Sequence, residues 1–300
     1  MTQHIHFSKS FSSSADLVSL LCARGLEIDN PGKAEFYIEN IGYYRLSAYM
    51  HPLLQIPKTS HKYKKGASFK KVMRLYRFDK KLRLFLFNEI EKIEIAIRRA
   101  VLQVTAEMTG DPFWLTNPSY FMDAGKFNET MKAISSEYAK SKEDFIQHFK
   151  RTYSDPYPPA WILGELLTIG NVNAIYRNIK QNRIRKRIAK RFGLPIDVFE
   201  SWITVLAVTR NACGHHARVW NKQNAIPPAK LIRPIGAWIT LPTDSMRTYF
   251  DICIIKYFLD VISPNNDMLA KLRWLFVDFP EIDLNALGFP KGWEMEPLWR

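Results

Sequence analysis

Residues 82–100 read LRLFLFNEIEKIEIAIRRA, and this pattern predicts the central element of the molecule. The apolar residues recur every three or four positions, which places their side chains on one face of an α-helix. This stripe consists of Leu82, Phe85, Leu86, Ile90, Ile93 and Ile97. The helical pattern begins near Ser68 and ends at Gly110-Asp111-Pro112, so we expect a single helix of about forty residues.

Shorter helical patterns occur on both sides of this stretch. Asn30-Pro31 is typical of a helix start, and it precedes two short helices that we expect to meet near Gly42. Further helices are predicted within residues 123–153, 160–179, 244–262 and 266–279, with an interruption at Gly170 in the second range. No segment shows the alternation typical of a β-strand. The sequence therefore predicts an all-α fold.

The chain divides into three regions by its sequence. Residues 1–14 are rich in serine and lack hydrophobic periodicity, so we expect a flexible leader. Residues 15–222 are predicted to form the main helical domain, which includes an N-terminal helical extension. Residues 223–300 are predicted to form a C-terminal helical region that packs on this domain, after a connection stiffened by four prolines.

The composition points to a polyanionic partner. The 43 Lys and Arg residues exceed the 29 Asp and Glu residues, which leaves a formal net charge of +14. Such an excess favours nucleic acid as the first candidate partner and a membrane surface as the second. The hydrophobic content of 47% excludes a wholly disordered chain.

Cysteine usage and targeting signals favour a cytoplasmic protein. Cys22, Cys213 and Cys253 are too few and too scattered for a disulfide framework or a zinc site. No stretch resembles a signal peptide, and the most apolar segment, residues 252–262, contains Lys256 and Asp260. We therefore expect a reducing compartment and no stable membrane association.

The most basic segment is residues 177–191, which contain eight Lys or Arg residues and no acidic residue. Ile184, Ile188 and Phe192 provide one narrow apolar seam, so the segment is predicted to be an amphipathic helix with a cationic outer surface. The residues expected to contact an RNA backbone are Arg183, Arg185, Lys186, Arg187, Lys190 and Arg191. A solvated face or a helix at a membrane surface would show the same pattern.

A polar cluster follows a core-facing helix near residue 209. Residues 209–221 read TRNACGHHARVWN, directly after apolar positions with helical spacing. On a continuous helix, Arg210 and His215 would point about 140° apart. Either Gly214 takes a left-handed conformation and ends the helix, or the helix continues and a second copy of the protein completes the site around Arg210.

Arginine beside histidine is a residue pair suited to RNA cleavage. The guanidinium of Arg210 can hold a phosphate through two hydrogen bonds, and the imidazole of His215 can transfer a proton to or from a ribose oxygen. The alternative for this spacing is structural, with Arg210 paired to a carboxylate or a backbone carbonyl and the two histidines at a helix end.

Five segments together resemble a known family. The residues Arg210-Asn211, His215-His216, Arg218 and Trp220-Asn221 resemble the Arg-x4-6-His signature of HEPN-superfamily ribonucleases, in the form found in Abi-like abortive-infection proteins of bacteria. The other segments are Gly42–Tyr49, Leu75–Arg83, Glu91–Arg98, and Pro159–Trp161 with Glu165 and Gly170. The family usually has alanine at the position of Gly214.

The resemblance implies a HEPN-like helical bundle with additional N- and C-terminal helices. It also implies a metal-independent endoribonuclease, or hydrolase, of phage defence or toxin–antitoxin systems, active as a homodimer and needing no cofactor. Arg210 would bind the reacting phosphate, His215 would act as general acid or base, and Asn211 would orient one of them, with His216 as a second-tier catalytic candidate.

Attack by the ribose 2′-OH would leave a 2′,3′-cyclic phosphate and a 5′-OH. Arg45 and Arg218 are further candidates for RNA contact. Glu94 could orient a catalytic side chain, and an ion pair with Arg98 is the simpler expectation.

Two other functions fit parts of the sequence. The same basic and aromatic residues would serve a non-catalytic protein that binds a structured RNA, including a regulatory RNA that keeps a toxin silent. A membrane-surface or protein-interaction module would explain the net charge but not the cluster at Arg210.

Overall fold

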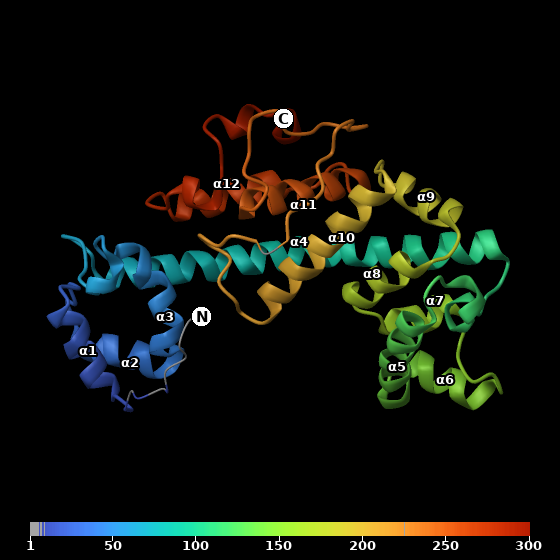
Figure 1. Ribbon diagram of the computed structural model, residues 1–300, viewed down its shortest axis with the longest axis horizontal. Coiled ribbons are helices and arrows are strands. Elements are labelled where there is room, and N and C mark those ends of the chain that lie inside the picture. The colour runs from blue at the N-terminus through green and yellow to red at the C-terminus, as the bar shows by residue number, and fades with distance from the viewer. Residues whose placement is uncertain (1–5, 7, 9, 225) are drawn as a thin grey trace. The chain divides into compact units, whose positions relative to one another are not determined.

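The computed structural model describes residues 6, 8, 10–224 and 226–300. Within these residues the regular structure is helical, and the only β-type pairings are four isolated bridges (Figure 1). The predicted all-α fold is confirmed. Half of the predicted leader, residues 1–5, 7 and 9, lies outside the described residues. The first described helix, α1 (Ser14–Ala23), begins where Ser13 and Asp16 form a capping box.

The chain forms two compact units. The N-terminal unit consists of residues 1–81 and 278–282, and the main unit consists of residues 82–277 and 283–300. The predicted subdivision near residue 222 falls within the main unit and stays a prediction.

The N-terminal unit begins with three short helices. α2 (Pro31–Ile41) starts at Asn30, whose side chain accepts the Lys33 N–H. Gly42, at φ 92°, joins it to α3 (Tyr43–Met50), as the sequence predicted. This conformation is open to glycine and strained for other residues.

Long-range contacts close the N-terminal unit. The buried Tyr49 hydroxyl donates to Asp79 at 2.5 Å. Residues 278–282 return to the start of the long helix, where Phe279 packs edge-on against Phe78 at 5.5 Å between ring centroids and Glu281 pairs with Arg74.

The predicted long helix is α4 (Phe69–Thr109), which has 41 residues. Five residues of its apolar stripe are fully buried: Leu82, Leu86, Ile90, Ile93 and Ile97. Each such side chain contributes about 1.5–3 kcal/mol through burial. Their spacing therefore fixes which face of α4 points into the core of the main unit.

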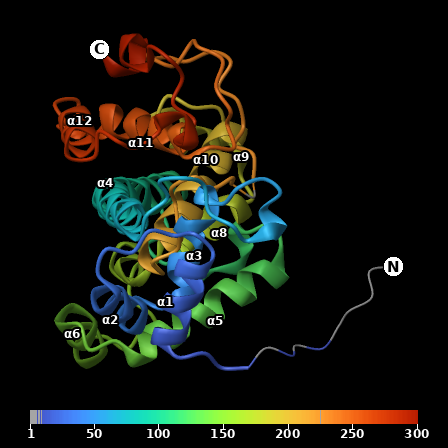
Figure 2. The ribbon, with the colours of Figure 1, turned by 90° about the vertical axis from the view of Figure 1, so that its left-hand side faces the viewer.

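The described residues of the main unit form eight more α-helices. They are α5 (Ala124–Lys140), α6 (Asp144–Thr152), α7 (Ala160–Leu163), α8 (Ile169–Asn178), α9 (Asn182–Arg191), α10 (Ile196–Gly214), α11 (Thr248–Ile262) and α12 (Met268–Asp278). In the main unit, α11 and α12 lie on one side of α4 and α5 lies on the other (Figures 1 and 2). α10 crosses α4 at an angle (Figure 1).

Short 3₁₀ turns complete the described regular structure. They are η1 (His51–Leu53), η2 (Lys58–Ser60), η3 (Trp114–Thr116), η4 (Pro118–Tyr120), η5 (Gly164–Leu166), η6 (Leu284–Leu287), η7 (Trp293–Met295) and η8 (Pro297–Trp299). The last two carry Trp293 and Trp299, which are buried against Tyr249 of α11. The aromatic C-terminus is thus part of the core of the main unit.

Two predicted helix boundaries were wrong. The helical stretch in residues 160–179 is interrupted before Thr168 and not at Gly170, because Thr168 and Asn171 form a capping box that starts α8. The basic helix begins at Asn182 and not at Arg177, because α8 continues to Asn178, whose buried side chain bonds the backbone of Asp123.

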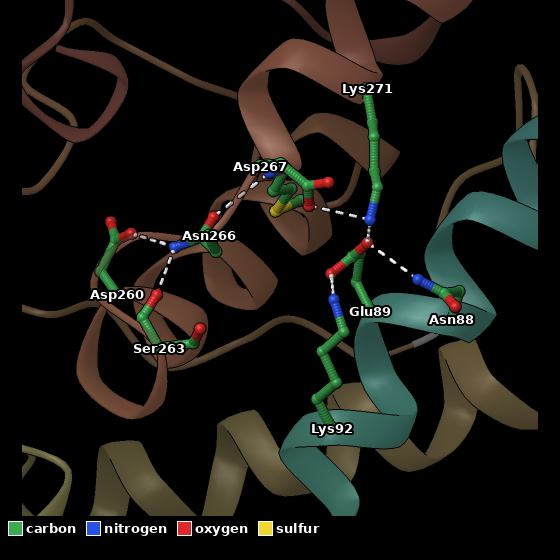
Figure 3. Close-up of polar contacts among 9 residues, drawn as sticks. Asn88, Glu89, Lys92, Asp260, Ser263, Asn266, Asp267 and Lys271 are labelled. Atoms are coloured by element: carbon green, nitrogen blue, oxygen red, sulfur yellow. Dashed lines mark hydrogen bonds and ion pairs between the residues drawn. The ribbon is translucent and has the colours of Figure 1, made fainter.

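A buried carboxylate connects α12 to α4. Glu89 accepts hydrogen bonds from Lys92 at 2.7 Å and from Lys271 at 3.0 Å, and Lys271 also pairs with Asp267 (Figure 3). Burial raises the pKa of Glu89, but the hydrogen bonds from Lys92 and Lys271 outweigh burial and hold that pKa below its ordinary value. Glu89 is therefore a charged structural group of the main unit.

None of the described helices is by itself long and apolar enough to cross a membrane, while the bent pair α9 and α10 meets that test by length and composition.

Candidate functional site

Arg210 lies near the C-terminal end of α10, one turn before its last residue, Gly214, and the apolar side of this helix is buried. Phe199, Trp202, Ile203 and Leu206 are buried, as their spacing predicted. The ring of Trp202 stacks on Trp238 with 4.9 Å between centroids, and Phe199 stacks on Phe192. A rigid core thus holds the backbone that carries Arg210.

The helix ends just after Arg210 through a Schellman motif. Gly214 is its last residue, and His216 takes the left-handed conformation at φ 57°. The His216 N–H donates to the Cys213 carbonyl at 3.1 Å, and the Ala217 N–H donates to the Ala212 carbonyl at 2.8 Å. The sequence left open whether Gly214 ends the helix in a left-handed conformation or the helix continues. The helix does end at Gly214, but the left-handed residue is His216, because the hydrogen bonds of the motif place that conformation two residues later.

Glu94 of α4 faces Arg210 from the core. Its carboxylate is 8% exposed, and its Oε2 lies 3.5 Å from Nε of Arg210. Its Oε1 accepts hydrogen bonds from Arg98 at 3.3 Å and from the Ile169 N–H at 3.0 Å. Both interactions considered from the sequence, the pair with Arg98 and the contact with a site residue, are therefore present.

The Arg210 guanidinium also lies over an aromatic ring. Its carbon is 5.3 Å from the centroid of Phe87, at the edge of a pocket of about 270 Å³ that Arg98 and Glu91 also line. The Arg210 side chain remains 34% exposed. No hydrogen bond joins its terminal nitrogens to a described residue, and the side chain lines the pocket.

Contacts from α4 and α11 fix the chain beyond the helix end. The buried Arg83 donates to the Ala217 carbonyl at 3.4 Å. Thr248 donates to the Val219 carbonyl at 2.9 Å, and Arg247 donates to the Asn221 side chain at 3.4 Å. The residues around the two histidines are therefore held from both sides.

The other predicted catalytic residues lie on the surface. Asn211, His215 and His216 are exposed, and Arg218 is half-buried. His215 is the C-cap residue that follows α10, with non-helical dihedrals of φ −88° and ψ 12°. Five helical steps of about 100° separate it from Arg210, which places the two Cα atoms about 140° apart around the helix axis. No hydrogen bond or ion pair joins the side chains of Arg210 and His215. One chain thus presents both groups without bringing them together.

A buried acid lies directly behind the site. Asp251 of α11 is 3% exposed, accepts two hydrogen bonds from the Asn224 amide and accepts a third from Thr209, the residue before Arg210. Burial raises the pKa of Asp251 to about 7, against the opposing effect of the hydrogen bonds from Asn224 and Thr209.

The basic helix α9 is amphipathic as predicted, because Ile184, Ile188 and Phe192 are buried. Five of its six predicted RNA-binding residues are exposed: Arg183, Lys186, Arg187, Lys190 and Arg191. The last three line a hollow of about 400 Å³ together with Val104 and Glu107 of α4.

Arg185 is placed differently from its neighbours on α9. It is partly buried and pairs with Glu200 of α10 and with Asn182. Arg45, the remaining predicted RNA-binding residue, is exposed on α3 of the N-terminal unit.

Sequence reasoning missed three groups that shape the site. Phe87, Arg83 and the backbone N–H of Ile169 all contact the residues around Arg210, but none belongs to the polar cluster at residues 209–221. The helical spacing of Arg83, Phe87 and Glu94 on α4 was a usable signal, because these positions share one helix face. Among the described residues, no group of three or more His, Cys, Asp or Glu side chains could hold a metal ion.

Comparison with known proteins gives one match. The family model described as Abi-like protein matches residues 36–221, which include Glu94 and Arg210. No curated protein is significantly similar to the chain. No solved structure is significantly similar to it either.

Proposed function

Because the chain belongs to the Abi-like protein family, we propose that it is an endoribonuclease of the HEPN type that acts in abortive infection. The observation that supports this proposal most directly is the setting of Arg210. Its Nε faces a buried carboxylate, its guanidinium carbon lies over the ring of Phe87, and its side chain lines an open pocket. A guanidinium fixed in this way is prepared for two parallel hydrogen bonds to a phosphate.

The reaction needs a proton acceptor and a proton donor beside the phosphate. In this proposal an imidazole of His215 takes the proton from the ribose 2′-OH or gives one to the leaving 5′-oxygen. Arg210 stabilises the charge that develops on the phosphate oxygens. Asn211, which is exposed next to Arg210, orients one of these groups, and His216 is the second candidate for proton transfer.

Glu94 acts in this proposal as a positioning residue. It is largely buried and contacts both Arg210 and Arg98, so its role in this proposal is to hold the guanidinium of Arg210 in place. Phe87 restricts the same guanidinium from its face.

A second copy of the chain would complete the site. About 140° separates Arg210 from His215 around the axis of an ideal helix, and no hydrogen bond joins their side chains, so in this proposal a histidine of the second copy faces the phosphate that Arg210 holds. A two-fold axis near Asn211 would bring two arginines and two histidines together. We therefore propose a homodimer with RNA as its substrate, located in the cytoplasm.

Separate substitution of the two reacting groups tests the function. Purified Arg210→Ala and His215→Ala chains should lose RNA cleavage by a factor of at least about 100, since each removes a group used in the transition state. Arg99→Ala and His148→Ala are matched controls, because both side chains are exposed on other helices of the main unit. The controls should cleave at the wild-type rate.

The products and the effect of chelation test the chemistry. Attack by the 2′-OH predicts 2′,3′-cyclic phosphate and 5′-OH ends, and the residue types of the site predict activity in EDTA. Products with 5′-phosphates, or activity restored only by a divalent ion, would reject this mechanism. Tight RNA binding with no cleavage by the wild-type chain would favour a non-catalytic RNA-binding protein instead.

A further inference from the structure

The N-terminal unit contains a groove that the site at Arg210 does not use. It lies between α2 and the first turns of α4 and has a volume of about 330 Å³. This volume falls within the range of small-molecule sites, about 300–1,000 Å³. Its floor is apolar, since Ala34, Phe69 and Met73 are all buried there.

An aromatic ring forms one wall of the groove. Tyr37 of α2 is half-buried, and its ring is tilted by 31° to that of Phe69 with 6.4 Å between centroids. The Tyr37 hydroxyl accepts a hydrogen bond from Arg77 at 3.0 Å. This bond fixes the tyrosine ring at the opening and places a guanidinium beside it.

The rim of the groove is cationic. Lys33, Lys70 and Arg77 are exposed there, and Asp29 is the one carboxylate among the described lining residues. Arg74 also lines the groove, but its charge is offset by Glu281 at 2.5 Å. An apolar pocket with an excess of cations at its opening fits a ligand that combines a ring with an anionic group.

We infer that this groove binds a nucleotide, with the base against Tyr37 and the phosphate at Arg77 and Lys33. Bases stack on aromatic side chains whatever their identity, and a guanidinium pairs readily with phosphate. The nucleotide can come from an RNA strand or exist free in solution, because both present the same base and phosphate. The inference rests on the groove alone and does not require the proposed cleavage.

Titration of the full-length chain with adenosine 5′-monophosphate, followed by ligand-observed NMR, tests the free-nucleotide source. We expect transfer of magnetisation from the wild-type protein to the adenine protons of the bound nucleotide. Binding should weaken about tenfold or more in Tyr37→Ala, because this variant loses the stacking surface. Arg77→Gln should weaken binding similarly, while Lys80→Gln, an exposed cation on α4 outside the groove, should not. Ribose 5-phosphate, which lacks the base, should bind at least about tenfold more weakly than the nucleotide.

A cross-linking experiment tests the RNA source. A 2′-O-methyl oligoribonucleotide cannot undergo 2′-OH attack, and one that carries 4-thiouracil should cross-link to residues 28–41 or 69–77. The result is independent of cleavage, so a catalytically inactive chain would still give it. Binding of either the nucleotide or the oligoribonucleotide in the groove supports the inference and identifies the source.

Two outcomes would overturn the inference. One is that neither probe binds the wild-type chain. The same holds if each probe binds equally to the wild type, to Arg77→Gln and to the double variant Tyr37→Phe/Arg77→Gln. The double variant keeps an aromatic ring at position 37 and should therefore fold. The other is that anionic phosphatidylglycerol vesicles occupy the groove while adenosine 5′-monophosphate does not compete.

Discussion

Glu94 Oε2 lies 3.5 Å from Arg210 Nε, and this contact joins the middle of α4 to the C-terminal part of α10. The same carboxylate accepts hydrogen bonds from Arg98 and from the Ile169 N–H, so one buried acid orders three separate segments of the main unit. The position of the partly exposed guanidinium therefore depends on a buried carboxylate from another helix.

Replacement of Glu94 should impair catalysis more than RNA binding. We expect Glu94→Gln to lower kcat about tenfold, because a neutral amide restrains the guanidinium less, and to leave KM within about threefold of wild type. The measurement is steady-state cleavage of a fluorescent RNA. Glu91→Gln, at an exposed position of the same pocket, is the control. Equal loss of kcat in both variants would argue against a specific role for Glu94.

Residues at the end of α10 should be suboptimal for stability. His216 has φ 57°, a conformation that glycine adopts without strain, so His216→Gly should raise the free energy of unfolding by about 1 kcal/mol. Urea denaturation of both chains measures the difference. A loss of stability would mean that contacts of the imidazole outweigh its backbone strain.

Gly214→Ala should also stabilise the chain, by about 0.5–1 kcal/mol. Gly214 is helical, and a Cβ atom there would meet Phe87 at 3.6 Å and Arg210 at 3.9 Å, which are ordinary contact distances. Cleavage should be retained. Thermal unfolding and RNA cleavage measured on the same preparation check both parts, and an inactive but stabilised variant would show that the guanidinium must move during the reaction.

Asp251 should make folding stability depend on pH. Its pKa rises from 3.8 to about 7 on folding, so the folded chain binds the proton more tightly than the unfolded chain. The contribution of Asp251 to stability is therefore greatest below pH about 4, declines as the pH rises to about 7, and then stays constant. Asp251→Asn should remove this decline. Urea denaturation at pH about 5 and about 8 tests it, and equal pH dependence in both chains would contradict the prediction.

The exposed cations of α9 should bind phosphates. Replacement of Arg183, Lys186 and Lys190 by Gln should weaken RNA affinity for all sequences. It should also reduce the slope of the logarithm of the binding constant against the logarithm of the salt concentration by about two, since each lost phosphate contact on a single strand removes about 0.7 from this slope. A chain with Lys126, Lys132 and Lys140 of α5 replaced by Gln loses the same charge elsewhere. If both triple variants change the slope equally, α9 has no special role.

Arg185 is a poor choice for that experiment although the sequence ranked it with its neighbours. Its ion pair with Glu200 joins α9 to α10, so its replacement would disturb packing as well as charge. Helical periodicity separates buried from exposed positions, but it does not reveal which cation at the boundary meets an acid from another helix.

Local spacing in the sequence predicts helices and their buried faces, but it does not predict contacts between distant residues. The limits of α4 and the buried face of α10 follow from local spacing and from Gly110, so they could be read in advance. The contact of Glu94 with Arg210 joins residues far apart in the chain, and the left-handed conformation of His216 depends on hydrogen bonds that propensity alone does not specify. Long-range pairs and strained backbone were therefore the parts that needed the structure.

The contribution of α4 to the site has a consequence for how this family can vary. One face of this continuous helix carries Arg83, Phe87, Glu94 and Arg98. The number of residues between them therefore fixes the relative directions of their side chains. Insertion of one residue between Phe87 and Glu94 would rotate every later side chain by about 100° relative to the earlier ones. Lineages that keep this site should therefore accumulate substitutions along α4 but neither gain nor lose residues within it.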